Sequence, residues 1–392
     1  MTILRAPWRC PPTSVRTAYF PPRKMNLLVT GGAGFIGANL VQQLLGDGGP
    51  LGALLTSVVT LDKLTYAGNL ANLAPVATDP RHSLVPGDIC NTPLVSELLA
   101  AHDVDAVLHL AAESHVDRSI DNPEEFITTN VVGTFRLLEA FRRHLRKSGR
   151  DRSADFGRPL AAGGTGLFLQ VSTDEVFGSL APDAAPFSEA SNYSPNSPYS
   201  ASKAGADHLA RAYFHTYGLP VVTTNCSNNY GPYQFPEKLL PLMIRKALRG
   251  EPLPVYGDGG NVRDWLYVGD HTRALELAAW AGRPGETYLL GGRCELTNLE
   301  VVRALLETVA DLAPERLAGP PEELITFVSD RPGHDRRYAI NPAKAEAHLG
   351  WVPHEDFRSG LRKTVAWYLE HEFWANRIEG ARYRGERLGA MA

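Results

Sequence analysis

Two groups of residues in this sequence have the types and spacing that a chemical reaction needs. Thr173, Asp174 and Glu175 are consecutive, and Tyr199 is followed one helical turn later by Lys203. A free tyrosine has a pKa of about 10, and a nearby cation favours its phenolate, so this Tyr-x-x-x-Lys spacing is typical of the base in nicotinamide-dependent redox enzymes. Elimination of water beside a carbonyl needs an acid and a base, and adjacent carboxyl groups supply both when one stays protonated. The pattern predicts a redox step coupled to elimination, with Thr173 contacting the substrate oxygen that Tyr199 deprotonates.

A glycine-rich turn, Gly31-Gly-Ala-Gly34-Phe-Ile-Gly37, follows the first predicted strand and opens the first predicted helix. Side chains here would keep the backbone away from a pyrophosphate, which the free N–H groups of the helix N-terminus would bind. Asp62 ends the second predicted strand, where a carboxylate accepts hydrogen bonds from the adenosine ribose and repels a 2′-phosphate. These features favour NAD over NADP, although the adjacent Lys63 weakens the preference. Asp88 follows the third strand, where it either contacts the adenine or serves as a turn or helix-cap residue.

Strands and helices alternate along most of the chain. Short apolar runs rich in β-branched residues predict strands, and apolar residues at helical spacing predict helices. The predicted strands are 26–30, 57–62, 82–86, 106–110, 167–172 and 221–225, and the predicted helices are 35–45, 93–101, 123–145 and 198–217. This alternation predicts an α/β fold with a doubly wound parallel sheet of the Rossmann type and a smaller C-terminal substrate-binding lobe.

The chain divides into three predicted regions. Residues 1–24 carry five basic residues, five prolines and no acidic residue, and they lack the apolar centre of a secretory signal. We interpret them as a disordered extension rather than a targeting peptide. Residues 25–229 are expected to form the NAD-binding domain. Residues 230–392 are expected to bind mainly the substrate, with the chain crossing back to the core around 263–290.

Composition excludes several classes of protein. The net charge of −4 offers no basic surface for nucleic acid, and no apolar run is long enough to span a bilayer. The four cysteines stand far apart without Cys-x-x-Cys spacing, which argues against a metal site and a disulfide framework. This cysteine usage fits a reducing cytoplasm.

Several segments, among them LVTGGAGFIGANLV, VSTDEVFG, SPYSASKAGADHL and DRPGHDRRYAI, resemble the extended short-chain dehydrogenase/reductases, and within them the nucleotide-sugar dehydratases. The resemblance runs from residue 25 to about 367, and Thr-Asp-Glu separates the chain from the epimerases, which lack the acid/base pair. It implies that Tyr199 takes the proton of the carbon-4 hydroxyl of dTDP-glucose, that Glu175 takes the carbon-5 proton and that Asp174 protonates the leaving carbon-6 hydroxyl. The implied cofactor is tightly bound NAD, and the implied product is a 4-keto-6-deoxy sugar nucleotide.

The resemblance also implies the binding residues, which are carried over position by position. The expected cofactor contacts are Gly31, Gly34, Phe35, Ile36, Gly37, Asp62, Lys63, Leu64, Thr65, Asp88, Ile89, Leu110, Ala111, Ala112, Ser114, Thr129, Tyr199, Lys203 and Asn229. The expected substrate contacts are Ser114, Thr173, Asn228, Glu237, Lys238, Leu239, Pro254, Tyr256, Arg263, Asn298, Arg331 and His334. Phe177, Gly269 and Asn341 depart from the family pattern, which concerns the fit of the substrate rather than the reaction. By analogy, helices 123–145 and 198–217 would form a homodimer interface.

Two other functions are consistent with the nucleotide-binding motif. A 4-epimerase would oxidise and reduce carbon 4 alone, and would place no deuterium at carbon 5 in heavy water. A nucleotide-sensing protein would keep the dinucleotide fold without turnover. The complete set Thr173, Asp174, Glu175, Tyr199 and Lys203 argues against a protein without turnover.

Overall fold

The computed structural model describes residues 24–382 except 47, 318 and 331–333. Its centre is a seven-stranded parallel sheet in the order β10-β6-β5-β4-β1-β2-β3. The strands are β1 (Met25–Thr30), β2 (Leu55–Asp62), β3 (His82–Pro86), β4 (Ala106–His109), β5 (Leu167–Thr173), β6 (Val221–Cys226) and β10 (Thr287–Leu290). The predicted α/β class with a doubly wound parallel sheet is confirmed. The predicted extension at 1–24 lies outside the described residues except for Lys24.

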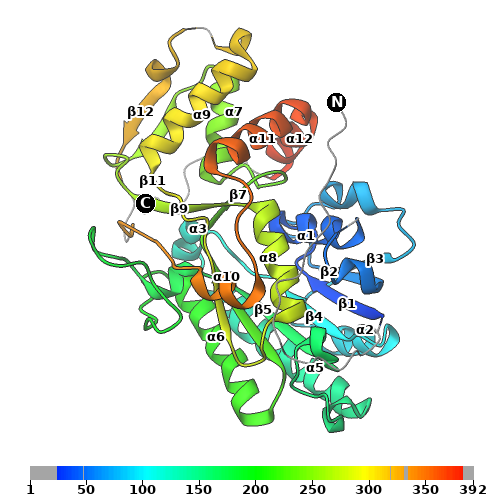
Figure 1. Ribbon diagram of the computed structural model, residues 1–392. Helices are drawn as coiled ribbons and strands as arrows, with labels where there is room; N and C mark the ends of the chain where they lie inside the picture. Colours follow the sequence, from blue (N-terminus) through cyan, green and yellow to red (C-terminus); the bar gives the residue numbers. More distant parts are fainter. Residues whose placement is uncertain (1–23, 47, 318, 331–333, 383–392) are drawn as a thin grey trace.

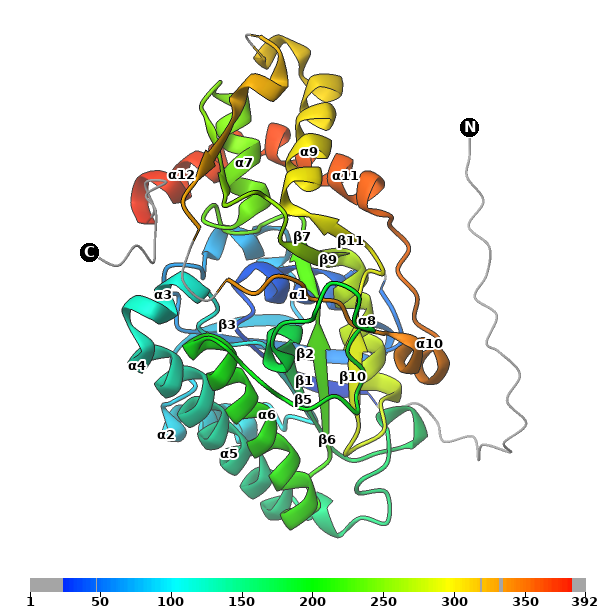
Figure 2. The same cartoon turned by 90° about the vertical axis from the view of Figure 1, so that its left-hand side faces the viewer.

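Helices cover both faces of this sheet (Figure 2). Apolar side chains of α1 (Phe35–Leu45) and α8 (Val268–Ala281) pack on one face. Those of α2 (Thr92–Ala101), α5 (Thr134–Lys147) and α6 (Pro198–Tyr217) pack on the other. Strands β1, β4 and β5 are buried along nearly their whole length, as expected for parallel strands covered on both sides.

The predicted helix over 123–145 is confirmed as one continuous helical run, but its middle is wound as a π-helix rather than an α-helix. The structure has α4 (Pro123–Phe126), then a wide π-helical turn, η3 (Ile127–Gly133), before α5 begins. Within η3, the buried amide of Asn130 accepts from the backbone N–H of Glu113 and donates to its carbonyl, both at 2.9 Å, and it donates to Ser202 Oγ at 2.8 Å. Such turns occur frequently at functional sites.

A second lobe lies above the carboxyl ends of the sheet strands (Figure 1). It has its own apolar core and two small sheets. The sheets consist of β7 (Asn228–Tyr230), β9 (Val262–Tyr267) and β11 (Glu295–Thr297), and of β8 (Leu253–Tyr256) and β12 (Ile325–Val328). The helices are α7 (Leu239–Leu248), α9 (Asn298–Leu312), α11 (Phe357–Glu370) and α12 (Glu372–Arg382). The remaining short helices, α3 (Val116–Asp121) and α10 (Ala343–Leu349), follow β4 and precede α11, respectively.

Two features of the described residues bear on the class of protein. Within the described ranges, no helix is long and apolar enough to cross a membrane. The same residues contain no group of three or more His, Cys, Asp or Glu side chains placed to hold a metal ion.

Candidate active site

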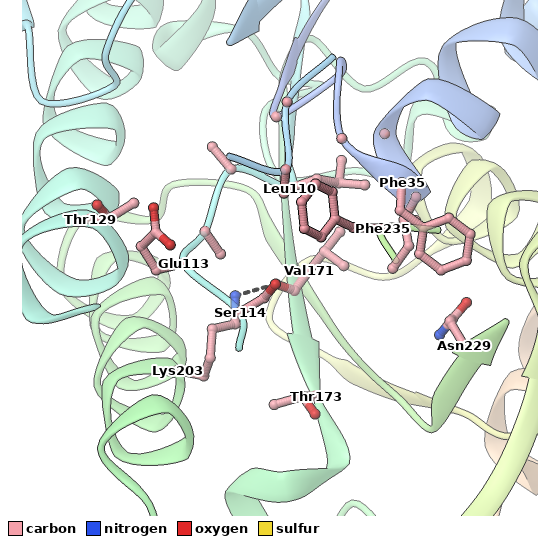
Figure 3. A pocket seen from close by; sticks show the side chains of 18 of the residues that line it. Phe35, Leu110, Glu113, Ser114, Thr129, Val171, Thr173, Lys203, Asn229 and Phe235 are labelled. Carbon is pink, nitrogen blue, oxygen red and sulfur yellow. Dashed lines mark hydrogen bonds between the residues drawn. The ribbon is translucent and has the colours of Figure 1, made fainter. Parts of the chain in front are cut away.

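A cavity of about 310 Å³ lies at the carboxyl ends of the central strands, between the two lobes (Figure 3). This is the edge where ligands bind in open parallel sheets. Most of the predicted site residues line it. They are Gly31, Gly34, Phe35, Ile36, Gly37, Asp62, Lys63, Thr65, Asp88, Ile89, Leu110, Ala111, Ala112, Ser114, Thr129, Thr173, Asp174, Glu175, Tyr199, Lys203, Asn228, Asn229, Glu237 and Lys238.

The other predicted site residues are not among those that line this cavity. Arg331 lies outside the described residues. Leu64 has a positive φ of 56°, packs against the apolar core of the sheet, and donates its N–H to the carboxylate of Asp62. The remaining six belong to the upper lobe, and their roles stay predictions: Leu239, Pro254, Tyr256, Arg263, Asn298 and His334.

The glycine turn between β1 and α1 has the shape that a dinucleotide requires. Gly31 has a φ of +70°, and a Cβ there would lie 2.7 Å from the backbone of Ala111. A Cβ at Gly37 would lie 2.1 Å from the carbonyl oxygen of Gly31. Gly34 borders the cavity and caps α1 without any side-chain hydrogen bond, so the first N–H groups of an 11-residue helix have no side-chain acceptor at the cap. These features fit the pyrophosphate of NAD.

Asp62 and Lys63 lie at the carboxyl end of β2, where the adenosine ribose would bind. The Asp62 carboxylate accepts from the N–H groups of Ala33 and Leu64 at 2.9 and 2.8 Å, which ties the glycine turn to β2. Lys63 forms an ion pair with Asp88 at 3.0 Å, so its charge is balanced within the protein. A ribose 2′-phosphate would therefore meet one carboxylate and a lysine that already has a partner, which favours NAD. Asp88 also accepts from the N–H of Cys90 at 2.8 Å, so the turn role considered for it is observed.

The two catalytic carboxyl candidates lie in different environments at the end of β5. Thr173 caps the short helical turn η6 (Asp174–Phe177) by accepting from the N–H of Glu175 at 3.3 Å, and its hydroxyl donates to Asp174 at 3.4 Å. Asp174 is 1% exposed, and burial, followed by the charge of Glu175, raises its pKa well above the usual value. Glu175 is only half-buried. The arrangement favours the protonated form of Asp174 beside a second carboxyl group.

The redox pair lies in the first two turns of α6. Ser197 and Ser200 form a reciprocal capping box that starts this helix, and Tyr199 and Lys203 follow on its buried side. Burial, followed by the charge of Glu175, raises the pKa of Tyr199 well above its usual value, while a hydrogen bond with Thr173 opposes this. Burial and the nearby carboxyl groups therefore favour the neutral phenol, so the predicted phenolate requires the positive charges of Lys203 and of the nicotinamide ring.

Lys203 is held by the sheet. Its ammonium donates to the carbonyl oxygen of Val171 at 2.7 Å, the bond drawn in Figure 3. Burial lowers the pKa of Lys203, and Asp207 is the largest influence that opposes this.

Several residues that line the cavity were not predicted. Glu113 immediately follows Leu110-Ala-Ala112 after β4, so the rule that ligands meet the carboxyl ends of parallel strands could have found it. Burial raises the pKa of Glu113. Phe235 reaches the cavity from the upper lobe, and no sequence motif around it predicts this position. The others are Leu61, Ala67, Gly68, Gly87, Val171, Ser172, Cys226, Ser227 and Gln234.

Comparisons of the sequence agree with this geometry. Residues 28–364 match the family model described as GDP-mannose 4,6 dehydratase. The chain is 52% identical over 365 residues to a dTDP-glucose 4,6-dehydratase of Neisseria meningitidis, covering 93% of this chain and 98% of that protein. It is 48% identical over 377 residues to the protein of the same name from Escherichia coli, covering 94% of this chain and all of that one.

Solved structures of similar fold include both dehydratases and epimerases. A dTDP-glucose 4,6-dehydratase from Streptomyces venezuelae, solved with NAD and TYD bound, has a TM-score of 0.79 and 46% identity, covering 90% of this chain and 100% of that chain. A UDP-glucose 4-epimerase from Thermotoga maritima, solved with UDP-glucose, has a TM-score of 0.74 and 27% identity, covering 88% of this chain and 99% of that chain. The greater identity is to the dehydratase, in agreement with the carboxyl pair after β5.

Proposed function

This chain belongs to the GDP-mannose 4,6 dehydratase family, and from its near full-length similarity to dTDP-glucose 4,6-dehydratases we propose that it converts dTDP-glucose to dTDP-4-keto-6-deoxyglucose. It is an NAD-dependent hydro-lyase of deoxysugar biosynthesis with no net redox change. The observation that carries the proposal is that the carboxyl pair Asp174 and Glu175 and the pair Tyr199 and Lys203 line the same cavity as the glycine turn.

The proposed mechanism assigns one task to each reacting side chain. Bound NAD supplies a reversible acceptor for the hydride of carbon 4. Tyr199 takes the proton of the carbon-4 hydroxyl, with the hydroxyl of Thr173 beside it. The resulting ketone acidifies carbon 5, whose proton Glu175 removes. Asp174 gives its proton to the departing carbon-6 hydroxyl, which leaves as water. Glu175 then returns its proton to carbon 5 while carbon 6 takes up the hydride that bound NAD would have accepted from carbon 4, so that no net redox change remains.

The cofactor and the nucleotide sugar would enter from opposite sides of the cavity. The glycine turn, Asp62 and the residues after β4 would hold NAD. The nucleotide end of the substrate would extend toward Glu237 and Lys238, which line the cavity below α7. Arg118 pairs with Glu237 at 3.0 Å, and Lys238 donates to the carbonyl oxygen of Ser114 at 3.1 Å, so this side of the pocket joins the two lobes.

A single assay tests the proposal and separates it from its alternatives. The purified protein is incubated in heavy water with dTDP-glucose, UDP-glucose or CDP-glucose, and the products are analysed by mass spectrometry and NMR, with Tyr199→Phe as the inactive control. We expect a 4-keto-6-deoxy product that carries deuterium at carbon 5, formed fastest from dTDP-glucose. An epimer without deuterium at carbon 5 would identify a 4-epimerase, and absence of any product from protein with NAD fully bound would identify a nucleotide-binding protein without turnover.

We also propose that the protein is a cytoplasmic homodimer. Three large apolar side chains are exposed on the two helical segments expected at the interface, namely Ile127 in η3, Phe135 in α5 and Tyr217 at the end of α6. The cysteines of the described part of the chain are Cys90, Cys226 and Cys294, all with free thiols, which suits a reducing compartment. Sedimentation velocity would measure the mass of the assembly.

A further inference from the structure

One buried carboxyl group beside the active site has no role in the mechanism above. Asp207 lies on α6, one helical turn beyond Lys203, and its residue is 4% exposed. Residues four apart on a helix share a face, so Asp207 follows Lys203 along the side of α6 that packs on the sheet. Burying an ionisable group costs free energy unless it is paired or hydrogen-bonded.

Three side chains from three different segments hold the Asp207 carboxyl group. Gln170 of β5 donates to Oδ1 at 3.3 Å, and Asn225 of β6 donates to Oδ2 at 3.2 Å. Tyr193, in the loop before α6, donates to Oδ2 through its hydroxyl at 3.1 Å. Burial raises the pKa of Asp207, and the charge of Lys203 and these hydrogen bonds oppose that shift. The donors fix the carboxyl group against β5, in which the carbonyl of Val171 accepts from Lys203.

Two other titratable side chains near Lys203 are neutral, so neither could replace the negative charge of Asp207. Cys226 of β6 has a buried thiol whose pKa is raised to about 12, so it is neutral at physiological pH. His109 of β4 is fully buried, and its pKa is lowered to about 3, so it is also neutral. Among the described groups that act on the pKa of Lys203, Asp207 is the only carboxyl group and the largest that raises it.

We propose that Asp207 is a positioning residue for Lys203, whose ammonium it keeps charged and anchored to β5 by its own buried negative charge. The inference rests on the proposed function, since it concerns the cation that would stabilise the phenolate of Tyr199. In this arrangement, α6 carries the base, the cation and the counter-charge of the cation on consecutive turns. Asp207 is not among the residues that line the cavity, so it would act through Lys203, which does line it.

A direct titration of Lys203 tests the proposal. Lysine labelled with carbon-13 at Cε is incorporated into the full chain, and the Lys203 signal is assigned by its loss in Lys203→Met. In Asp207→Asn, which keeps the size and most hydrogen bonds of the side chain, we expect the pKa of Lys203 to fall by about one unit or more relative to the unmodified chain. Tyr193→Phe is the matched control, because it removes one hydrogen bond to the same carboxyl group and leaves its charge.

Activity supplies the second measurement. If Asp207 acts through Lys203, Asp207→Asn lowers kcat in the unmodified chain but adds little to the loss in Lys203→Met, so the two effects are strongly non-additive. The proposal is overturned by an unchanged Lys203 titration in Asp207→Asn, by an equal shift in Tyr193→Phe, or by additive losses of activity. An unmodified chain that fails to dehydrate dTDP-glucose would refute the proposed function instead, and the titration would still decide the link between Asp207 and Lys203.

Discussion

A buried histidine that does not line the cavity leads to a quantitative prediction about acid stability. His271 lies in the first turn of α8 and is 0% exposed. Neither of its ring nitrogens has a hydrogen-bond partner among the described residues. Burial alone lowers the pKa of His271 from 6.5 to about 3. The folded protein therefore holds this ring neutral over a pH range in which the unfolded chain would protonate it.

The sign and size of the effect follow from proton linkage. As the pH falls through 6.5, the unfolded chain binds a proton at His271 and the folded chain does not until about pH 3, so protons favour unfolding throughout this window. Within this window, each pH unit below 6.5 lowers the free energy of unfolding by about 1.4 kcal/mol. Between about pH 7 and about pH 5, this single group removes about 2 kcal/mol of stability, a large share of the roughly 5–15 kcal/mol typical of folded proteins.

Replacing the ring by an apolar side chain of similar volume should remove this dependence. We expect His271→Leu to gain about 2 kcal/mol in unfolding free energy relative to the unmodified chain when both are moved from about pH 7 to about pH 5. Urea unfolding followed by circular dichroism at several pH values measures the difference, and His354→Leu, at an exposed position, is the matched control. A constant difference between His271→Leu and the unmodified chain across this pH range would refute the reasoning.

The active site yields three further predictions. Glu175→Gln removes the base for carbon 5, so neither keto product nor deuterium at carbon 5 of recovered dTDP-glucose should appear in heavy water; normal product formation would contradict the assignment. Asp174→Asn removes the acid, so dehydration should slow by about a hundredfold or more. Recovered dTDP-glucose from this variant should still carry deuterium at carbon 5. An equal loss of dehydration and of deuterium exchange would contradict the separate roles of Asp174 and Glu175. Gly37→Ala places a Cβ 2.1 Å from the carbonyl oxygen of Gly31, so NAD affinity measured by calorimetry should fall by about tenfold or more, whereas Gly319→Ala, with nothing within 4 Å of its Cβ, should bind normally.

Much of the central sheet could be predicted because its signals are local. Helices α1 and α6 begin and end at the predicted residues, since a glycine turn or a serine cap precedes each of them. The π-helical winding of η3 within the predicted helix over 123–145 was not predicted. The contact of its Asn130 with Glu113 joins residues 17 apart, and no pattern within the helix reveals such a contact. No individual strand or helix of the upper lobe was predicted, because its strands are short and pair with distant segments.

The candidate site also contains residues that local motifs predict and residues whose position depends on contacts between distant segments. The turn from Gly31 to Gly37 and the residues at the ends of β2, β4 and β5 line the cavity, as expected from motifs that each lie within one strand–turn–helix unit. The position of Phe235 and the pairing of Lys63 with Asp88 arise from the way separate loops meet, so sequence spacing could not predict them.

The asymmetry between the two carboxyl groups after β5 is what suits this site to elimination rather than to redox exchange alone. Asp174 and Glu175 are neighbours in sequence, yet the cap at Thr173 starts a tight helical turn that buries the first and leaves the second half-buried. Burial raises the pKa of Asp174 and so favours its protonated form, which places no second negative charge beside Glu175. The same strand end thus presents an acid and a base without competition for one proton. In an epimerase of this fold such an arrangement would serve no purpose, because carbon 4 alone would change and no hydroxyl would leave.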